Sequence, residues 1–222
     1  PPDAQPQTHG DVSCSLPSRE EALRTLRASL PGHAGLVATT GKTGRELFAL
    51  GDDTRNLYVV GSMGCASAVG LGIALNSERP IAVIDGDGAA LMKLGNLSTV
   101  GHYRPKTLIH VLINNGIHDS TGGQPTNSGT VNFAAVAAAC GYTNVYTCYG
   151  SEALRRAIEA ALREDGPHFI HVPVRPGTIK DLPRPDVTPA EVGQRFSRHL
   201  QCIEVEGVAW AIGKRGPASQ RP

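Results

Sequence analysis

The chain has 222 residues, of which 40% are hydrophobic and 18% are charged, and its formal net charge is +1. These values are typical of a globular protein with one large domain and a substantial core. A net charge near zero gives no electrostatic reason to expect nucleic acid as a partner. The apolar runs are all shorter than the roughly 18 residues that a membrane-spanning helix needs, so no membrane partner is expected.

The cysteines carry information about the compartment. They number five, lie scattered along the chain and form no C-x-x-C pair. This pattern argues against a disulfide framework and against a zinc site, and it is typical of a reducing compartment. No signal peptide pattern is present. We therefore expect a cytoplasmic protein. The first residue is Pro rather than Met, which indicates either processing or the later part of a longer protein.

Apolar segments of strand length alternate with helical patterns along most of the chain. Ser18 and Glu21 have the spacing of a helix capping box, and they open the first helical pattern. Strands are expected at residues 35–41, 56–61, 80–86, 107–115, 144–149 and 168–174, and helices at 20–30, 43–50, 65–76, 94–103, 132–141, 151–165 and 188–200. This alternation predicts an α/β fold, with a doubly wound parallel sheet and helices on both faces.

Composition divides the chain into three regions. Residues 1–18 are rich in Pro and Gln, and we expect a linker or disordered arm there. Residues 19–200 hold the alternating elements and form the predicted domain. Residues 201–222 end in a basic, Pro-rich stretch and form a tail of unknown role.

Four loops that follow predicted strands are rich in glycine and short polar residues, and they span residues 39–44, 61–64, 85–90 and 114–126. In a doubly wound sheet, ligands bind beyond the carboxyl ends of the strands. Such loops present backbone N–H groups and helix N-termini, which suit an anion. The first loop is not a P-loop, because five residues rather than four separate Gly35 from Gly41.

The segment after the second loop is unusually rich in small residues. It lacks the G-x-G-x-x-G spacing of a dinucleotide fingerprint. We therefore interpret Ala66, Ala68 and Gly70 as residues that let a helix pack closely against the sheet.

An aspartate between two glycines, Asp87, ends one of the predicted buried strands. The G-D-G at 86–88 is followed after 25 residues by N-N at 114–115, with one helix and one strand between them. A crossover of this kind returns both loops to the same edge of the sheet. The Asp87 carboxylate, the Asn115 amide oxygen and a backbone carbonyl shortly beyond would form an all-oxygen set that suits Mg²⁺. Taken alone, Asp87 could equally cap a helix or form an Asx turn.

The G-D-G and N-N pair resembles the diphosphate-binding signature of thiamin diphosphate enzymes. Met63 lies 24 residues before Asp87 and resembles the bulky apolar residue that supports the bent cofactor in that family. Longer motifs resemble the C-terminal half of the phosphonopyruvate decarboxylases and are similar to sulfopyruvate decarboxylase β subunits: TTGKTGREL, GSMGCASAVGLGIAL, DGDGAALMKLGNLSTVG and HDSTGGQPT. The resemblance covers about residues 19–200, which would then form the diphosphate- and Mg²⁺-binding domain.

The resemblance implies roles for individual residues. Asp87, Asn115 and the carbonyl of Ile117 would ligate Mg²⁺. The residues that would contact thiamin diphosphate are these three together with Thr40, Gly41, Gly61, Ser62, Met63, Gly88 and Ala89.

The implied reaction is the non-oxidative decarboxylation of a 2-oxo acid, foremost 3-phosphonopyruvate to phosphonoacetaldehyde and CO₂. His118 would be the catalytic residue, through proton transfer. An anionic substrate calls for cationic or hydrogen-bond donors, and the candidates are Lys42, Ser120, Thr121 and Gln124. Alternatively, HDSTGGQPT is a structural loop with His118 and Asp119 exposed.

The resemblance also implies a partner. In these enzymes a glutamate that activates the cofactor belongs to a pyrimidine-binding domain, for which residues 1–18 leave no room. We expect that domain upstream in the same protein or on a separate subunit, within a homo- or hetero-oligomer. Alternatives are a sulfopyruvate decarboxylase β subunit, a non-catalytic thiamin diphosphate-binding relic, a 2-oxo acid oxidoreductase β subunit and a nucleotide-binding module.

Overall fold

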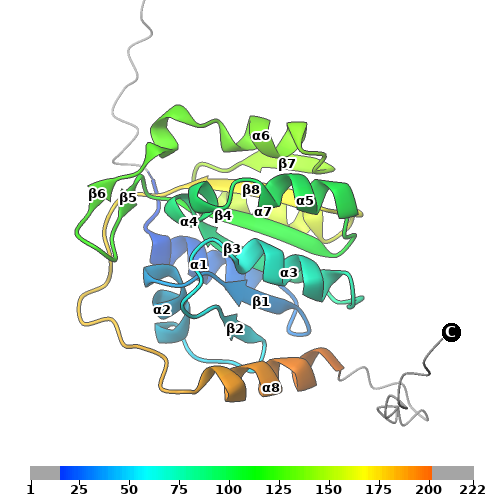
Figure 1. Ribbon diagram of the computed structural model, residues 1–222, viewed down its shortest axis with the longest axis horizontal. Helices are drawn as coiled ribbons and strands as arrows, with labels where there is room; N and C mark the ends of the chain where they lie inside the picture. The colour runs from blue at the N-terminus through cyan, green and yellow to red at the C-terminus, as the bar shows by residue number, and fades with distance from the viewer. Residues whose placement is uncertain (1–15, 202–222) are drawn as a thin grey trace, which may run out of the picture.

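The computed structural model describes residues 16–201, and a six-stranded parallel sheet runs through their centre (Figure 1). Its strands are β1 (Gly35–Ala38), β2 (Asn56–Tyr58), β3 (Ile81–Gly86), β4 (Leu108–Asn114), β7 (Asn144–Thr147) and β8 (His168–Pro173). They lie in the order β2-β1-β3-β4-β8-β7, and every pairing is parallel. The predicted doubly wound α/β sheet is confirmed.

Helices cover both faces of the sheet. On one face lie α1 (Arg19–Ser29), α2 (Lys42–Ala49) and α7 (Ser151–Ala161). On the other lie α3 (Ala66–Ala74), α5 (Asn96–Tyr103) and α6 (Phe133–Ala139). The last helix, α8 (Pro189–Gln201), packs along the edge strand β2. No helix within residues 16–201 is long and apolar enough to span a membrane.

The continuous apolar run of β3 is explained by its two covered faces. Ala82 and Ile84 belong to the core under α1, α2 and α7, whereas Ile81 and Val83 belong to the core under α3, α5 and α6. All four side chains are fully buried. A strand buried on both faces needs no polar alternation, and this is why the sequence there reads as uninterrupted hydrophobic residues.

The sequence predicted the main elements but missed the short ones. The capping box is present, since the Glu21 N–H donates to the Ser18 hydroxyl at 3.1 Å and the Ser18 N–H donates to the Glu21 carboxylate at 2.6 Å. The structure adds α4 (Asp87–Met92), the short helix η2 (Asn127–Thr130) and a hairpin of β5 (Ile117–His118) and β6 (Gln124–Pro125). Strands of two residues are too short for a period-two pattern to reveal.

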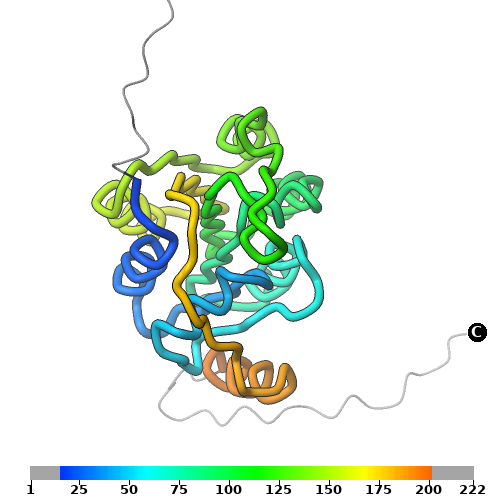
Figure 2. The backbone as a smooth tube through the Cα atoms, turned by 90° about the vertical axis from the view of Figure 1, so that its left-hand side faces the viewer, coloured from blue at the N-terminus to red at the C-terminus, as the bar shows by residue number. Residues whose placement is uncertain are grey.

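Residues 174–188, which we call the strap, run from β8 to α8 across the carboxyl ends of the strands (Figure 2). The Arg45 guanidinium donates to the carbonyls of Leu182 and Pro183. The Arg175 N–H donates to the Pro17 carbonyl at 2.9 Å, so the chain just before α1 is bound to the strap. The remainder of the predicted arm and all but the first residue of the predicted tail, residues 1–15 and 202–222, lie outside the described residues.

The small residues of α3 differ in their packing. Ala66 and Gly70 are buried against the sheet as expected, whereas Ala68 is exposed, so the close-packing interpretation is wrong for Ala68. A Cβ atom at Gly70 would lie 2.1 Å from Val83 Cγ2, but one at Gly72 would meet nothing within 4 Å. Only Gly70 is therefore required by packing.

We predict opposite effects for alanine at these two glycines. Gly70→Ala should lower the free energy of unfolding by about 1–3 kcal/mol, because the new methyl group overpacks the core. Gly72→Ala should raise it by about 0.5–1 kcal/mol, because alanine favours the helix. Urea unfolding of both variants checks this. Equal effects would contradict the assigned packing.

Candidate active site

The predicted site residues converge at the switch point of the sheet. After β1 the chain moves outward to β2, and it then returns to β3 and β4 on the other side of β1. Such a reversal leaves a crevice at the carboxyl ends of the strands. A cavity of about 90 Å³ lies there, and the predicted residues that line it are Thr40, Lys42, Met63, Asp87, Gly88, Ala89, Asn115, Ile117, His118, Ser120 and Thr121.

Four predicted residues lie at the margin of this cavity instead of lining it. Gly41 has φ 93°, and a Cβ atom there would lie 2.9 Å from the Ser120 hydroxyl oxygen. Gly61 and Ser62 are exposed just before α3. Gln124 is also exposed, and its side-chain oxygen accepts a hydrogen bond from the Thr121 hydroxyl at 3.2 Å.

The Asp87 carboxylate is buried without a counter-charge. Its side chain is 2% exposed, and its hydrogen-bond donor is the Thr126 hydroxyl at 2.5 Å. Within residues 16–201 it makes no ion pair and accepts no backbone N–H, so the alternative role as a helix cap or Asx turn is wrong. A buried carboxylate with one neutral donor is costly unless a cation joins it.

The Asn115 amide is held in one orientation. Its nitrogen donates to the Asp119 carboxylate at 2.8 Å, and its oxygen accepts from the Ile117 N–H at 3.3 Å. Because an ionised carboxylate only accepts, Asp119 fixes which end of the amide is oxygen. The Asp87 carboxylate and the Asn115 amide oxygen thus share one cavity with Ile117. Such an oxygen-only donor set fits Mg²⁺.

His118 and Met63 close over Gly88 at the start of α4. A Cβ atom at Gly88 would lie 2.7 Å from His118 Cε1 and 3.5 Å from Met63 Cε. A larger residue there would force the His118 ring to shift, whereas its contact with Met63 would be an ordinary one. The absence of a side chain at Gly88 also lets a ligand approach the backbone N–H groups at the beginning of the helix.

A buried ionic network beside the site was missed by the sequence analysis. The Arg19 guanidinium donates to both oxygens of Glu46 at 3.0 and 2.9 Å and to the Asp119 carboxylate at 3.0 Å. The Asp119 side chain is 10% exposed, so the interpretation of Asp119 as an exposed loop residue is wrong. Nothing in the local sequence pairs these residues, because Arg19 lies 27 and 100 positions from its two partners.

Burial also affects a histidine next to the site. His171 of β8 lies 3.1 Å from the Asn114 amide nitrogen. Desolvation lowers the pKa of His171, and the nearby Asp87 carboxylate opposes this change. A neutral imidazole at this position accepts the Asn114 N–H.

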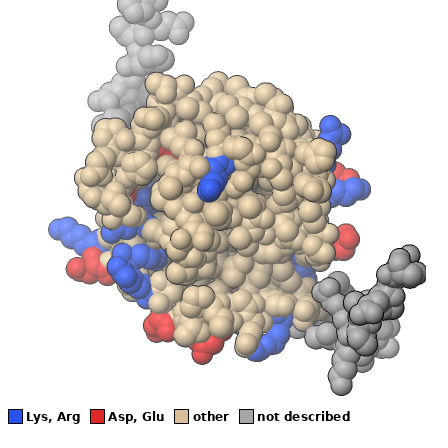
Figure 3. Space-filling view, in the orientation of Figure 1, with Lys and Arg blue, Asp and Glu red and all other residues tan. Residues whose placement is uncertain are grey.

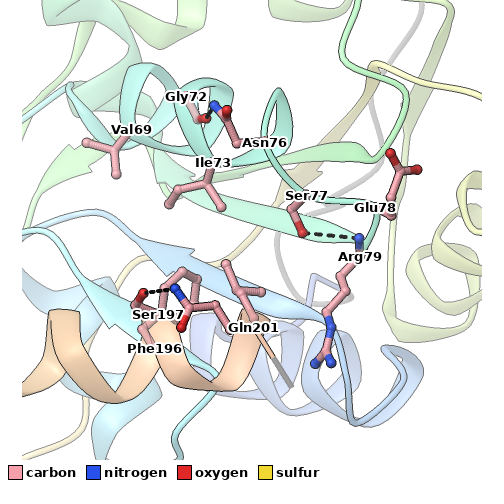
Figure 4. Close-up of a pocket in the computed structure, with 11 residues that line it drawn as sticks. Val69, Gly72, Ile73, Asn76, Ser77, Glu78, Arg79, Phe196, Ser197 and Gln201 are labelled. Atoms are coloured by element: carbon pink, nitrogen blue, oxygen red, sulfur yellow. Dashed lines mark hydrogen bonds between the residues drawn. The ribbon is translucent and has the colours of Figure 1, made fainter. Parts of the chain in front are cut away.

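A further cavity of about 510 Å³ lies between α3 and α8 (Figure 4). Apolar side chains of both helices line it, among them Val69, Ile73 and Phe196. It is closed at one end by Arg79, whose guanidinium donates to the His199 carbonyl at 2.7 Å. Arg79 lies just before β3, at the amino end of the sheet, and none of the predicted site residues lines this cavity.

We predict that removal of the Arg19 charge is strongly destabilising. Arg19→Met leaves the buried Glu46 and Asp119 carboxylates without their cation, which should lower the free energy of unfolding by about 3–5 kcal/mol. Arg24→Met is the matched control, because Arg24 pairs with Glu20 on the exposed face of the same helix and should cost less than about 1 kcal/mol. Urea unfolding measures both, and a similar loss in the two variants would contradict the prediction.

Comparison with protein families supplies independent evidence. Residues 47–172 match the model of the thiamine pyrophosphate enzyme, C-terminal TPP binding domain. The chain is 51% identical over 184 residues to phosphonopyruvate decarboxylase of Streptomyces viridochromogenes, which covers 83% of this chain and 46% of the relative. It is 39% identical to sulfopyruvate decarboxylase subunit beta of Methanothermobacter thermautotrophicus, over 82% of this chain and 95% of that subunit.

Solved structures show the same fold. The chain is similar to the thiamine diphosphate-dependent 4-hydroxybenzoylformate decarboxylase of Rhodococcus jostii, with a TM-score of 0.62 and 18% identity. The match covers 81% of this chain and 36% of that structure. The chain also spans about half the length of the phosphonopyruvate decarboxylases that it matches, 46% in two cases. It corresponds in extent to the sulfopyruvate decarboxylase subunits.

Proposed function

This chain belongs to the thiamine pyrophosphate enzymes, as a C-terminal cofactor-binding domain, and we propose that it is the diphosphate- and Mg²⁺-binding half of a 2-oxo acid decarboxylase. The observation that carries this proposal is the buried, uncompensated Asp87 carboxylate beside the oriented Asn115 amide. A divalent cation and a diphosphate together would balance this arrangement, since Mg²⁺ completes its shell with phosphate oxygens.

The substrate that we propose is 3-phosphonopyruvate, because the relatives at 51% and 52% identity bear the name phosphonopyruvate decarboxylase. Sulfopyruvate is the alternative, supported by the β subunits that match over most of their length. Both acids carry a tetrahedral oxyanion, and similar donors would bind either one. A non-catalytic relic is less well supported, because Asp87 and Asn115 are both retained in the cavity.

When bound, thiamin diphosphate supplies the electron sink that allows CO₂ to leave a 2-oxo acid. The chain's own residues hold and orient the groups. Asp87, Asn115 and the Ile117 carbonyl would hold Mg²⁺, and the N–H groups of Gly88 and Ala89 would bind the diphosphate.

The remaining contacts follow the same assignment. Met63, which lines the crevice, would support the bent conformation of thiamin diphosphate. The His118 ring lies against Gly88 at the start of α4. From there His118 would move a proton at the reacting centre. The other proposed contacts to the cofactor are Thr40, Gly41, Gly61 and Ser62, and the other proposed contacts to the substrate are Lys42, Ser120, Thr121 and Gln124.

We further propose that a pyrimidine-binding domain or subunit completes the site. The relatives named subunit beta imply a partner, and the phosphonopyruvate decarboxylases are about twice as long as the match. The face formed by α3 and α5 carries few charged side chains (Figure 3). Large apolar side chains are exposed at or near these helices, including Val69, Met92 and Tyr103. Exposed apolar surface of this kind is typical of an interface.

Removal of the Asp87 charge should abolish Mg²⁺-dependent cofactor binding. Loss of a group that hydrogen-bonds a metal ligand typically lowers metal affinity roughly 10- to 100-fold. Asp87→Asn removes a proposed ligand itself, so it should weaken thiamin diphosphate binding by at least that factor. Titration calorimetry with and without Mg²⁺ measures this. The ligand-free variant should be as stable as the wild type, because the substitution removes a buried charge that has no counter-ion. Asp165→Asn is the control, since Asp165 is an exposed partner of Lys106. Unchanged affinity in Asp87→Asn would overturn the assignment.

The proposal also predicts that the chain alone releases no CO₂ from 3-phosphonopyruvate or sulfopyruvate, even with thiamin diphosphate and Mg²⁺. The reason is that a group from the missing half activates the cofactor in this class of enzyme. A coupled CO₂ assay on the purified chain measures this, with and without the pyrimidine-binding half from the same genome. Full turnover by the chain alone would refute the need for a partner.

A further inference from the structure

We propose that a cavity beside the cofactor crevice binds the tetrahedral oxyanion of the substrate. The cavity has a volume of about 470 Å³ and lies between the start of α2, the end of β2 and the strap. It adjoins the cofactor crevice, because Thr39, Thr40, Lys42 and Ser120 line both. This inference rests on the proposed function, and it extends it from the cofactor to the class of substrate.

The lining of this cavity is positively charged. Lys42 and Arg45 of α2 and Arg184 of the strap line it, and none of the lining residues among those described is a carboxylate. Figure 3 shows Lys and Arg side chains gathered over α2 and the strap, with acidic side chains beside them. A cavity lined by charges of one sign concentrates ligands of the opposite sign.

These cations are not neutralised by neighbours. Within residues 16–201, neither Lys42 nor Arg184 takes part in an ion pair, and the Arg45 guanidinium donates to neutral carbonyls of the strap. The nearest acidic residue along α2 is Glu46, which is committed to Arg19. The cavity therefore keeps its positive charge.

An unpaired buried hydroxyl gives independent evidence of a ligand. The Thr39 side chain is 2% exposed, and its hydroxyl oxygen has no hydrogen-bond partner among the described residues. Buried polar atoms in folded proteins are nearly always hydrogen-bonded. Thr39 lines this cavity as well as the crevice, so an oxyanion bound here would accept a hydrogen bond from the hydroxyl. The first N–H groups of α2 lie beside it, with no side-chain cap at Gly41, and favour the same charge.

Two sources of oxyanion are chemically possible, the cofactor diphosphate and the substrate phosphonate or sulfonate. Arg184, Arg45 and the apolar wall of Val59 and Val60 line the outer cavity but not the crevice that holds Asp87. Arg45 and Arg184 are thus separated from the proposed Mg²⁺ site, whereas Lys42 lies between the two cavities. We assign them to the substrate, whose oxyanion needs a counter-charge of its own.

Titration calorimetry on the purified chain tests this assignment, with phosphonoacetate as the probe and acetate as the analogue without the phosphonate. Phosphonoacetate is titrated into the chain before and after saturation with thiamin diphosphate and Mg²⁺. We expect binding in both states, and much weaker binding of acetate. Lys42→Gln and Arg184→Gln should each weaken the binding of phosphonoacetate at least tenfold. Arg163→Gln changes an exposed arginine just beyond α7, and it should leave the affinity for phosphonoacetate unchanged.

The separate titrations distinguish failure of this inference from failure of the proposed function. The inference is wrong if Arg184→Gln weakens the binding of thiamin diphosphate as much as that of phosphonoacetate. It is also wrong if the cofactor displaces phosphonoacetate, because the cavity then binds the diphosphate. Wild-type affinity in both variants also overturns it. If thiamin diphosphate fails to bind the wild type even when the pyrimidine-binding half is present, the proposed function fails, and the cofactor-free titration still decides whether the cavity holds an oxyanion.

Discussion

The site depends on one electrostatic constraint, the burial of the Asp87 carboxylate at the end of a strand that is covered on both faces. The described part of the chain, residues 16–201, supplies a single neutral donor, from Thr126 on the far side of the hairpin. Since desolvating an unpaired carboxylate is unfavourable, folding alone leaves this position under-compensated. The neighbouring strand places Asn115 in the same cavity, where its amide oxygen is the second proposed metal ligand. The fold thus builds an anionic position whose natural complement is a cation, and this is what connects the sheet topology to cofactor binding.

The support of that position comes from residues far away in the sequence. Arg19 at the start of α1 joins Glu46 of α2 to Asp119, and Asp119 holds the Asn115 amide. The strap joins the same network, because the Thr178 hydroxyl donates to Glu46 at 2.9 Å. The first helix, the second helix and the segment after the last strand are therefore coupled to a single proposed metal ligand. A change in any of them reaches the site through buried, directional hydrogen bonds.

The distance in sequence between interacting residues explains what could and could not be predicted from the sequence. Strands such as β3 were visible as apolar runs. Asp87 was visible as a site residue only through its pairing with Asn115 at the end of the next strand, because taken alone it could equally have formed an Asx turn. The hairpin at Ile117 was not visible, because two-residue strands carry no periodic pattern. Arg19 and Glu46 were not visible either, since a buried ion pair across 27 positions leaves no local signal. Long-range polar contacts and the shortest helices and strands were the missing part.

The cofactor crevice and the outer cavity differ in charge, and this bears on the order in which ligands bind. In the cofactor crevice, Asp87 and the Asp119–Arg19–Glu46 network hold three carboxylates against two cations, Arg19 and Lys42. At the outer end, Lys42, Arg45 and Arg184 face a cavity without carboxylates. The buried Asp87 carboxylate opposes a diphosphate in the crevice until a cation joins it, which favours binding of Mg²⁺ with the diphosphate or before it. A second oxyanion meets no such barrier at the outer end. The charge pattern alone therefore favours cofactor at the inner position and an anionic substrate at the outer one.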